Sequence, residues 1–145
     1  MIEVFVEVQA GSRDKRLYDA ETLRYRETRR VMLPYPFPYG FVLGTRCEDG
    51  EGVDCYILTS DPLEAGTVVG CQPVGLLEQA EDKEIDHGVL ATLPGQSADL
   101  SRELHEKLSS FIRGVFRAFP DTAVQVGRIL PKESALEYLR EHRSK

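Results

Sequence analysis

Aliphatic and polar residues alternate at the start of the chain, with an aliphatic residue at every second position from Ile2 to Val8. A period of two puts these side chains on one face of a sheet, which predicts an edge or half-buried strand that ends near Gln9. Further short strands are predicted between Gly, Asp and Pro turns, at residues 16–18, 23–26, 30–33, 39–43, 53–58, 68–77 and 89–93. Three prolines between residues 34 and 38 predict a stiff, extended segment without regular pairing.

After Pro94 the apolar residues change to steps of three, four and seven, from residue 100 to residue 119. This spacing predicts an amphipathic helix of about 20 residues, capped near Ser97 or Asp99 and ended by Pro120. A strand at residues 124–129 and a closing helix at residues 133–141 follow. Short strands followed by helices predict one α+β domain, residues 1–145, built as a small closed β-barrel with helices packed outside.

Charge is distributed unevenly along the 145 residues. Twenty-four acids and eighteen bases give a net charge of −6, which argues against a nucleic-acid-binding protein. Between Glu48 and Asp86, eleven acids stand against the single base Lys83, a balance of −10, whereas the rest of the chain carries +4. One segment is therefore an anion and the remainder is a mild cation.

The cysteines at positions 47, 55 and 71 are odd in number and lack CxxC spacing. They predict reduced thiols in a cytoplasmic protein and argue against a disulfide framework or a zinc site. The chain shows no basic leader before an apolar stretch and no run of about 18 apolar residues, so we expect neither export nor membrane insertion.

Common catalytic motifs are absent from the sequence: GxxxxGK[ST], GxGxxG before a helix, HExxH and GxSxG. Their absence argues against a P-loop, a Rossmann site and a zincin. His87, His105 and His142 show no metal-ligand spacing, so we expect them to be solvated surface residues.

Residues 48–54 (EDGEGVD) gather carboxylates around two glycines. In an extended backbone Asp49 and Glu51 point the same way, about 6 to 7 Å apart, and the glycines permit a turn that brings Asp54 back towards them. A second acidic group, residues 81–86 (EDKEID), lies further along the chain. Two like charges about 4 Å apart repel by about 4 kcal/mol at an effective dielectric near 20, so convergence requires a hard cation such as Mg²⁺ or Mn²⁺. Two interpretations stay open: solvated acidic loops that never meet, and oxygen ligands of a shared cation.

The N-terminal region carries the opposite charge, with seven Lys and Arg residues against four acids between residues 13 and 30. Arg binds phosphate oxygens in a bidentate manner, and Lys binds them as a point charge. These bases are either outward-facing positions of short hairpins or phosphate ligands. Cations beside metal-binding acids form the two halves of a phosphoryl-transfer site.

Five short segments carry a resemblance to the family I inorganic pyrophosphatases, because they occur in the order found in that family. They are residues 6–8 (VEV), 11–15 (GSRDK), 35–41 (YPFPYGF), 48–54 (EDGEGVD) and 73–75 (PVG), within a stretch from Val4 to Pro94. The resemblance implies an OB-like, five-stranded β-barrel with flanking C-terminal helices. It also implies a cytoplasmic, Mg²⁺-dependent enzyme, with Mn²⁺ as a substitute ion, and a homo-oligomer that is usually a hexamer in bacteria.

The same resemblance implies roles for individual residues. The carboxylates that match the ligands of two or more Mg²⁺ ions are Asp49, Glu51, Asp54, Glu81 and Asp86. Among them, Glu51 with Asp49 and Asp54 matches the catalytic group that aids the attack of water. Glu7 matches a supporting acid at the cavity wall. The positions that match phosphate ligands are Lys15, one of Arg29 or Arg30, Tyr39, and Arg117 near the end of the long helix.

The sequence departs from the family pattern close to these positions. The departures are Leu17 in place of a polar residue, Glu51 and Glu81 in place of aspartates, Gly52 in place of a proline, Gly88 in place of a lysine, and Phe116 in place of a tyrosine. Lys83 is the candidate to replace the missing lysine. Since a misplacement of about 1 Å costs about 100-fold in rate, these departures bear directly on turnover.

The leading hypothesis is an inorganic diphosphatase, which uses a metal-activated water to hydrolyse pyrophosphate to two phosphates. The departures keep two alternatives open. One is a pyrophosphatase-like fold that has lost turnover and serves as a phosphate-binding, metal-binding or structural module. The other is a diphosphatase that acts on a larger phosphoanhydride, such as a nucleotide.

Overall fold

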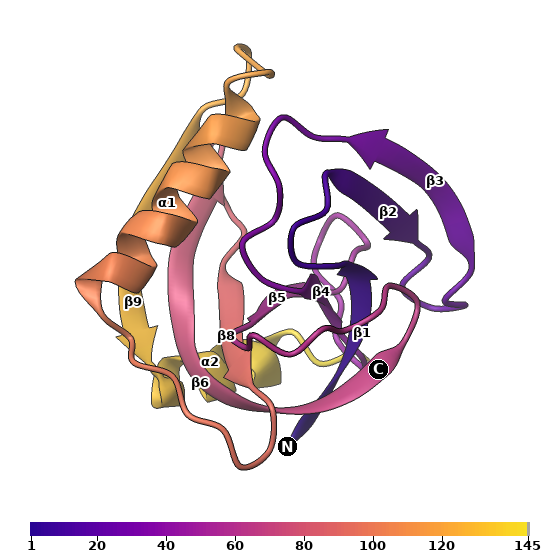
Figure 1. Cartoon of the computed structure of the whole chain (residues 1–145), viewed down its shortest axis with the longest axis vertical. Coiled ribbons are helices and arrows are strands. Elements are labelled where there is room, and N and C mark those ends of the chain that lie inside the picture. The colour runs from indigo at the N-terminus through magenta and orange to yellow at the C-terminus, as the bar shows by residue number, and fades with distance from the viewer. Residues whose placement is uncertain (145) are drawn as a thin grey trace.

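The structure, a computed structural model, describes residues 1–144, so the predicted domain of residues 1–145 ends one residue beyond the described range. In chain order the elements are β1 (Ile2–Val8), β2 (Asp14–Tyr18), β3 (Tyr25–Arg30), β4 (Tyr39–Val42), β5 (Val53–Ile57), β6 (Val68–Glu81), β7 (Glu84–Ile85), β8 (Gly88–Thr92), α1 (Arg102–Phe116), β9 (Val124–Pro131) and α2 (Lys132–Glu141). Strands fill the first two thirds of the chain, and both helices lie in the last third (Figure 1).

Five strands form a partly closed ring in the order β1-β4-β5-β8-β6, because β1 pairs with β6 as well as with β4. The β5–β8 pair is parallel, and the other pairs of the ring are antiparallel. A Cβ atom on Gly40 would lie 1.8 Å from the carbonyl oxygen of Phe5, so only glycine fits where β4 approaches β1. This ring with its C-terminal helices confirms the predicted OB-like α+β fold.

Strand β6 connects the ring to the helices. It pairs in turn with β1, β8, β9 and β7 along its 14 residues. Its register with β8 shifts between Pro73 and Gly75, where a proline without an amide hydrogen is tolerated. Helix α1 lies over β9, and α2 packs against β6 (Figure 1).

Strand β1 is more deeply buried than its pattern predicted. Val4 to Val8 are all buried, and β1 lies between two partner strands, so the prediction of an edge or half-buried strand was wrong. The cause is a second layer on its outer face: the Phe5 ring packs 4.8 Å from that of Tyr18 and 5.5 Å from that of Phe41.

Strands β2 and β3 form a separate two-stranded sheet beside the ring (Figure 1). All six residues of β3 are exposed, so the apolar pattern did not reveal the bounds of this strand. The predicted strands at residues 23–26 and 30–33 are in fact one strand, Tyr25–Arg30, held by its pairing with β2.

Helix α1 begins later and ends earlier than its spacing predicted. Its N-cap is Ser101, whose hydroxyl accepts a hydrogen bond from the Leu104 amide at 3.2 Å, and not Ser97 or Asp99. The helix ends at Phe116, and Phe119 is 53% exposed beyond it. Neither α1 nor α2 of the described chain is long and apolar enough to cross a membrane.

Candidate active site

The predicted site residues come from separate strands that meet beside the ring. Register pairs Tyr39 of β4 with Tyr56 of β5, and Asp54 lies two residues before Tyr56. Because side chains alternate along a strand, Asp54 shares a face with the tyrosine pair. The rings of Tyr39 and Tyr56 lie 5.0 Å apart, so the carboxyl group of Asp54 lies on the same face as these two packed rings.

Asp54 and Asp86 form the electrostatic centre of the site. Burial raises the pKa of Asp54 well above its ordinary value, and the charge of Asp86 raises it further, partly offset by Lys15 and the Tyr39 hydroxyl. Burial also raises the pKa of Asp86, with the charge of Asp49 next in size. The hydrogen bond from Asp54 acts in the opposite direction and lowers the pKa of Asp86. A bound cation favours the ionised form of both acids.

Lys15 of β2 is the cation closest to this pair. Its ammonium group lies 5.6 Å from the centre of the Tyr39 ring. Burial alone lowers the pKa of Lys15, but Tyr35, Asp54, Glu7 and Glu81 together raise it above its ordinary value. Lys15 therefore stays charged among groups from several strands.

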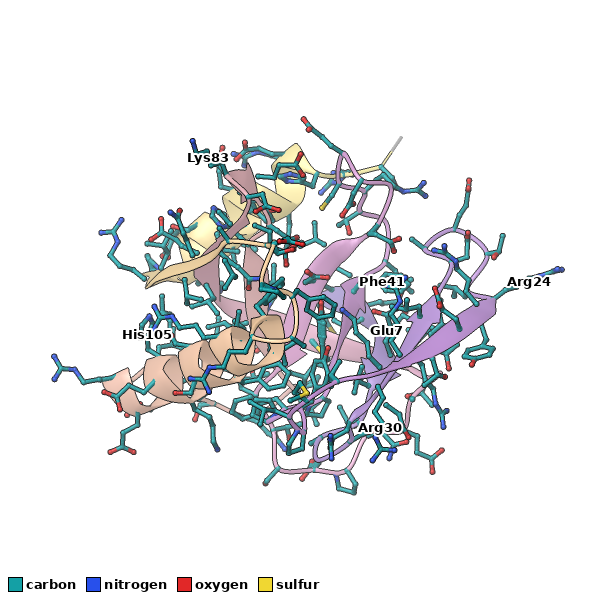
Figure 2. The ribbon with its side chains drawn as sticks, turned by 90° about the horizontal axis from the view of Figure 1, so that it is seen from above. Glu7, Arg24, Arg30, Phe41, Lys83 and His105 are labelled. Atoms are coloured by element: carbon teal, nitrogen blue, oxygen red, sulfur yellow. The ribbon has the colours of Figure 1, made fainter. Side chains whose placement is uncertain are left out.

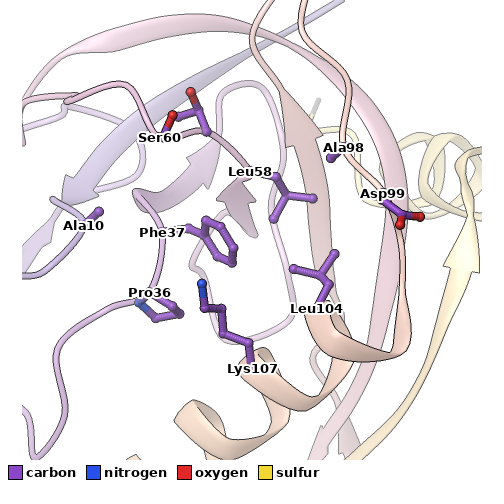
Figure 3. Close-up of a pocket in the computed structure, with 10 residues that line it drawn as sticks. Ala10, Pro36, Phe37, Leu58, Ser60, Ala98, Asp99, Leu104 and Lys107 are labelled. Atoms are coloured by element: carbon purple, nitrogen blue, oxygen red, sulfur yellow. The ribbon is translucent and has the colours of Figure 1, made fainter.

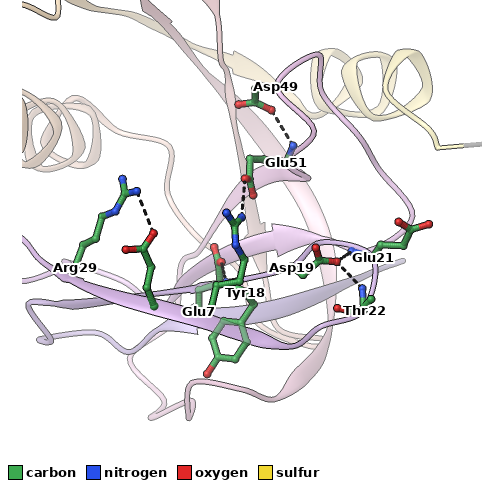
Figure 4. Close-up of polar contacts among 10 residues, drawn as sticks. Glu7, Tyr18, Asp19, Glu21, Thr22, Arg29, Asp49 and Glu51 are labelled. Carbon is green, nitrogen blue, oxygen red and sulfur yellow. Dashed lines mark hydrogen bonds and ion pairs between the residues drawn. The ribbon is translucent and has the colours of Figure 1, made fainter.

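Glu7 stands at the back of the site on β1. Its carboxylate accepts a hydrogen bond from the Tyr18 amide at 3.2 Å, and only 7% of the residue is exposed (Figure 4). Burial raises the pKa of Glu7 from 4.5 to about 7, although the Tyr18 amide and Lys15 act in the opposite direction.

Asp49 and Glu51 lie on an exposed loop at the rim of the site. The Asp49 carboxylate accepts a hydrogen bond from the Glu51 amide at 2.9 Å, which fixes a tight turn. The Glu51 carboxylate lies 3.5 Å from the guanidinium of Arg26 on β3 (Figure 4). Glu51 is therefore directed towards the basic hairpin in this structure, while the charge of Asp49 reaches Asp86.

Glu81 and Asp86 flank the β6–β7 hairpin. Burial and the charge of Asp86 raise the pKa of Glu81. Asp82 and Lys83 form the turn between them, with φ angles of 49° and 71°, a combination typical of a tight two-residue hairpin turn. Lys83 is exposed and points away from the region of Glu7 (Figure 2).

Within residues 1–144, no ion pair joins the three arginines suggested by the resemblance to the predicted metal ligands. Register places Arg29 directly opposite Lys15, and Arg30 opposite Asp14. Directly opposite side chains share a face of the hairpin, so Arg29 shares the face of Lys15 and Arg30 does not. Arg29 pairs with Glu27 at 3.1 Å and Arg30 with Asp14 at 3.8 Å. Arg117 is exposed at the C-cap of α1.

Sequence reasoning missed Arg26, Tyr35 and Tyr56 as parts of this site. The ring of Tyr35 stacks on that of Tyr39, with 5.2 Å between their centres. Burial raises the pKa of the Tyr35 hydroxyl, and the charge of Lys15 offsets part of this rise. The alternation of apolar residues at 53–58 is the signal that could have placed Tyr56 on the face of Asp54. Arg26 is one of seven similar bases, so the sequence alone could not single it out.

The histidines are not solvated surface residues, contrary to the prediction. His87 is partly buried and accepts a hydrogen bond from the Gln79 amide at 3.0 Å. The ring of His105 lies 2.6 Å from the Gly127 carbonyl oxygen, and that of His142 lies 2.8 Å from the Tyr138 carbonyl oxygen. Helix periodicity places a residue on a face but does not reveal what covers that face.

Two glycines that depart from the family pattern have different surroundings. A Cβ atom on Gly52 would lie 2.8 Å from the Phe41 ring, so this ring occupies the space that a larger residue would need. A Cβ atom on Gly88 would lie 3.4 Å from the Tyr56 ring, an ordinary contact.

Leu17, another departure from the family pattern, lies on the Lys15 face of β2, opposite Glu27.

The donor set fits a hard divalent cation. The candidate ligands are all carboxylates, the donors that Mg²⁺ and Mn²⁺ prefer. Burial is the main cause of the raised pKa values of Asp54 and Asp86, and a bound cation favours the ionised forms. Within residues 1–144, no three Asp, Glu, His or Cys side chains are close enough to form a complete ligand set.

A pocket of about 400 Å³ lies elsewhere, between the proline-rich segment and the start of α1 (Figure 3). Phe37, Leu58 and Leu104 give it apolar walls, and the Lys107 ammonium lies 5.2 Å from the centre of the Phe37 ring. None of the carboxylates described above lines this pocket, so its size does not make it the reaction centre.

Known proteins are similar to this chain in sequence and in fold. The sequence model of the family described as inorganic pyrophosphatase matches residues 4–144. The inorganic pyrophosphatase of Nanoarchaeum equitans is 28% identical, over 97% of this chain and 94% of its own length. The crystal structure of an inorganic phosphatase from Anaplasma phagocytophilum is similar with a TM-score of 0.86 and 27% identity, over 97% of this chain and 90% of that chain. The crystal structure of the inorganic pyrophosphatase from Thermus thermophilus has a TM-score of 0.84 and 27% identity, over 95% of this chain and 86% of that chain. The chain therefore belongs to the inorganic pyrophosphatase family.

Proposed function

We propose that this chain hydrolyses inorganic pyrophosphate to two phosphates, with Mg²⁺ as its cofactor and Mn²⁺ as a substitute. The observation that carries the proposal is the partly buried Asp54–Asp86 pair, on which the charge of Lys15 acts. Burial raises the pKa of both acids, so a bound cation would favour their ionised forms. The Lys15 ammonium, which lies near the Tyr39 ring, provides a partner for phosphate. The family relationship supports pyrophosphate as the substrate.

Asp49, Glu51, Asp54, Glu81 and Asp86 would hold the cations. When bound, the cations act as Lewis acids that polarise the phosphoryl group and make the attacking water more acidic. Glu51 accepts the proton of that water. The water oxygen forms a bond to one phosphorus, the bridging P–O bond breaks, and its electron pair leaves with the second phosphate.

The remaining residues bind and orient the substrate. Lys15 neutralises a phosphate group, and the Tyr39 hydroxyl donates a hydrogen bond to it. Arg29 is the better candidate of the two hairpin arginines, because it lies opposite Lys15. Arg117, exposed at the C-cap of α1, is a further candidate phosphate ligand. Glu7 keeps Lys15 in place from behind and does not itself contact the substrate.

The test is phosphate release from pyrophosphate with and without Mg²⁺, in the unmodified chain and in Asp54→Asn. We expect turnover that depends on Mg²⁺ and is lost in the variant. Glu64→Gln is the matched control, since it neutralises an exposed acid of the same acidic segment and should leave turnover unchanged. No Mg²⁺-dependent release, or full activity in Asp54→Asn, would contradict the proposal.

Calorimetry and the phosphate-release assay together distinguish the two alternatives. Nothing in the fold or the relatives favours a module without turnover; calorimetric binding of Mg²⁺ and pyrophosphate with no hydrolysis would establish it. Faster release from a nucleoside triphosphate than from pyrophosphate would identify a larger phosphoanhydride as the substrate.

We also propose a cytoplasmic homo-oligomer, a hexamer by analogy with the family, formed from a chain that folds as one domain. Three free cysteines support a reducing compartment. Exposed apolar side chains, such as Met32 at 58% and Ile85 at 67%, support contacts between subunits. A monomeric mass in light scattering would contradict the oligomer.

A further inference from the structure

Three aromatic rings at the end of α2 stand between the two acidic segments. The His87 ring lies 5.1 Å from that of Tyr138, which in turn lies 4.1 Å from that of His142. Tyr138 is only 7% exposed. This ring stack, defined as His87, Tyr138 and His142, plays no part in the reaction proposed above.

On one side the ring stack is fastened to the segment that carries Asp86. The Asp86 amide donates to the Gln79 carbonyl oxygen at 2.9 Å, and the Gln79 amide donates to Nδ1 of His87 at 3.0 Å. Because Nδ1 accepts, the proton of the neutral ring lies on Nε2. Asp86 is thus anchored to β6 next to a ring that packs on Tyr138.

On the other side the ring stack is fastened to the loop that carries Asp49. The Arg46 amide donates to the His142 carbonyl oxygen at 2.8 Å, and the Ser144 amide donates to the Gly44 carbonyl oxygen at 2.9 Å. Thr45 and Arg143 also form a β-bridge. These backbone contacts fix the start of the loop that leads to Asp49.

The two attachments form one continuous path from Asp86 through His87, Tyr138 and His142 to Arg46 and the Asp49 loop. We propose that Tyr138 is a positioning residue, which holds the Asp86 segment and the Asp49 loop at the spacing that a shared divalent cation needs. The inference rests on the proposed function. Partners outside the ligand shell orient the ligands, and their loss typically weakens metal affinity by 10- to 100-fold.

The alternative is that Tyr138 only contributes to the core of the fold. Leu139→Ala is the matched control, because Leu139 is a similarly buried neighbour on α2 that is absent from the ring stack. Both variants are expected to lower the melting temperature. Only loss of the Tyr138 ring should change cation affinity.

The experiment is calorimetric titration of the full chain with Mg²⁺ alone, without substrate, with melting temperatures measured in parallel. We expect Tyr138→Leu to bind Mg²⁺ about 10-fold more weakly, Tyr138→Phe to restore the affinity by keeping the ring, and Leu139→Ala to bind as the unmodified chain does. If Tyr138→Leu does not fold, His142→Ala replaces it and should weaken binding in the same direction.

The outcomes separate this inference from the proposed function. Unchanged Mg²⁺ affinity in Tyr138→Leu, or an equal loss in Leu139→Ala, would overturn the positioning role and leave the proposed function intact. A folded, unmodified chain that binds no Mg²⁺ and releases no phosphate would overturn both.

Discussion

The inner half of the site and its rim differ in burial and in how their charges are stabilised. The inner half comprises Asp54, Lys15 and Glu7, which strands hold in buried or partly buried positions and whose pKa values are all raised. The rim comprises Glu51 and Arg26, side chains that are 52% and 53% exposed and joined by one ion pair. Ionisation of the two acids in the inner half costs folding free energy, because desolvation opposes their charge, and the charge of Lys15 offsets part of this cost. The rim adapts at little cost, since solvent already screens its charges.

The largest expected effect comes from Asp54→Asn, which should move stability and activity in opposite directions. An amide of the same shape removes the buried carboxyl group that Asp86 repels, so the protein without Mg²⁺ should melt about 3 °C higher. Mg²⁺-dependent phosphate release should fall by at least about 100-fold. Differential scanning calorimetry without Mg²⁺ and a phosphate-release assay check the two parts.

A lower melting temperature in Asp54→Asn would contradict the view that the inner half is under electrostatic strain. The control is Asp61→Asn, an exposed acid of the same segment whose carboxylate accepts a hydrogen bond from Gln96 at 3.0 Å. The Asn amide oxygen can still accept this hydrogen bond, which becomes weaker without the negative charge, so stability should fall slightly and phosphate release should stay unchanged.

The sequence predicted the fold well where the pattern of burial decides the structure. Five ring strands and both helices follow from apolar spacing, since the interior of a small sheet requires it. Strand β3 was predicted only at its two ends, as parts of two separate strands, because all its residues are exposed. Its structure depends on pairing with β2, which a local pattern does not reveal.

The candidate site was predictable in its residue types but not in its geometry. The acidic spacing at residues 48–54 indicated Asp49 and Glu51, and the resemblance added Asp86 and Lys15. That Glu51 turns towards Arg26 depends on the relative position of a loop and a hairpin that are far apart in the chain. Electrostatic partners of this kind follow from tertiary packing, and one sequence does not contain them explicitly.

The second prediction concerns Lys15→Met, which removes the cation of the inner half. Loss of one partner of a buried charge group costs about 3 to 5 kcal/mol, and we expect the lower end at pH 8 because Lys15 is only partly buried. At pH 5 the loss should shrink, since neighbouring acids with raised pKa values take up protons. Urea unfolding at both pH values measures this, with Lys107→Met on α1 as the control. An equal loss at both pH values would contradict the coupling.

The third prediction concerns the pH dependence of stability through Glu7. Its pKa is 4.5 in the unfolded chain and about 7 in the folded one, so between these values the folded state binds more protons. Stability should therefore fall as pH rises from 4.5 to 7, by at most about 3 kcal/mol, and change no further above that range through this residue. Urea unfolding across this range should show a flatter curve for Glu7→Gln.

The matched control for Glu7→Gln is Glu3→Gln, an exposed acid on the same strand. Its curve should follow that of the unmodified chain. If Glu7→Gln and the unmodified chain had the same pH dependence of stability, protonation of Glu7 would not contribute to that dependence.

The smallest effect is expected at the rim, from Arg26→Gln. An exposed ion pair such as Arg26–Glu51 gains little, so the free energy of unfolding should fall by less than about 0.5 kcal/mol, and the difference should disappear in 1 M salt because the Debye length is then about 3 Å. Arg24→Gln, at the exposed end of the hairpin (Figure 2), controls for the loss of one positive charge. A loss above about 1 kcal/mol that persists in high salt would mean that Arg26 and Glu51 are preorganised like the inner half. The lengthened Glu51 would then be held away from the other carboxylates, and hydrolysis would have to begin by breaking that pair.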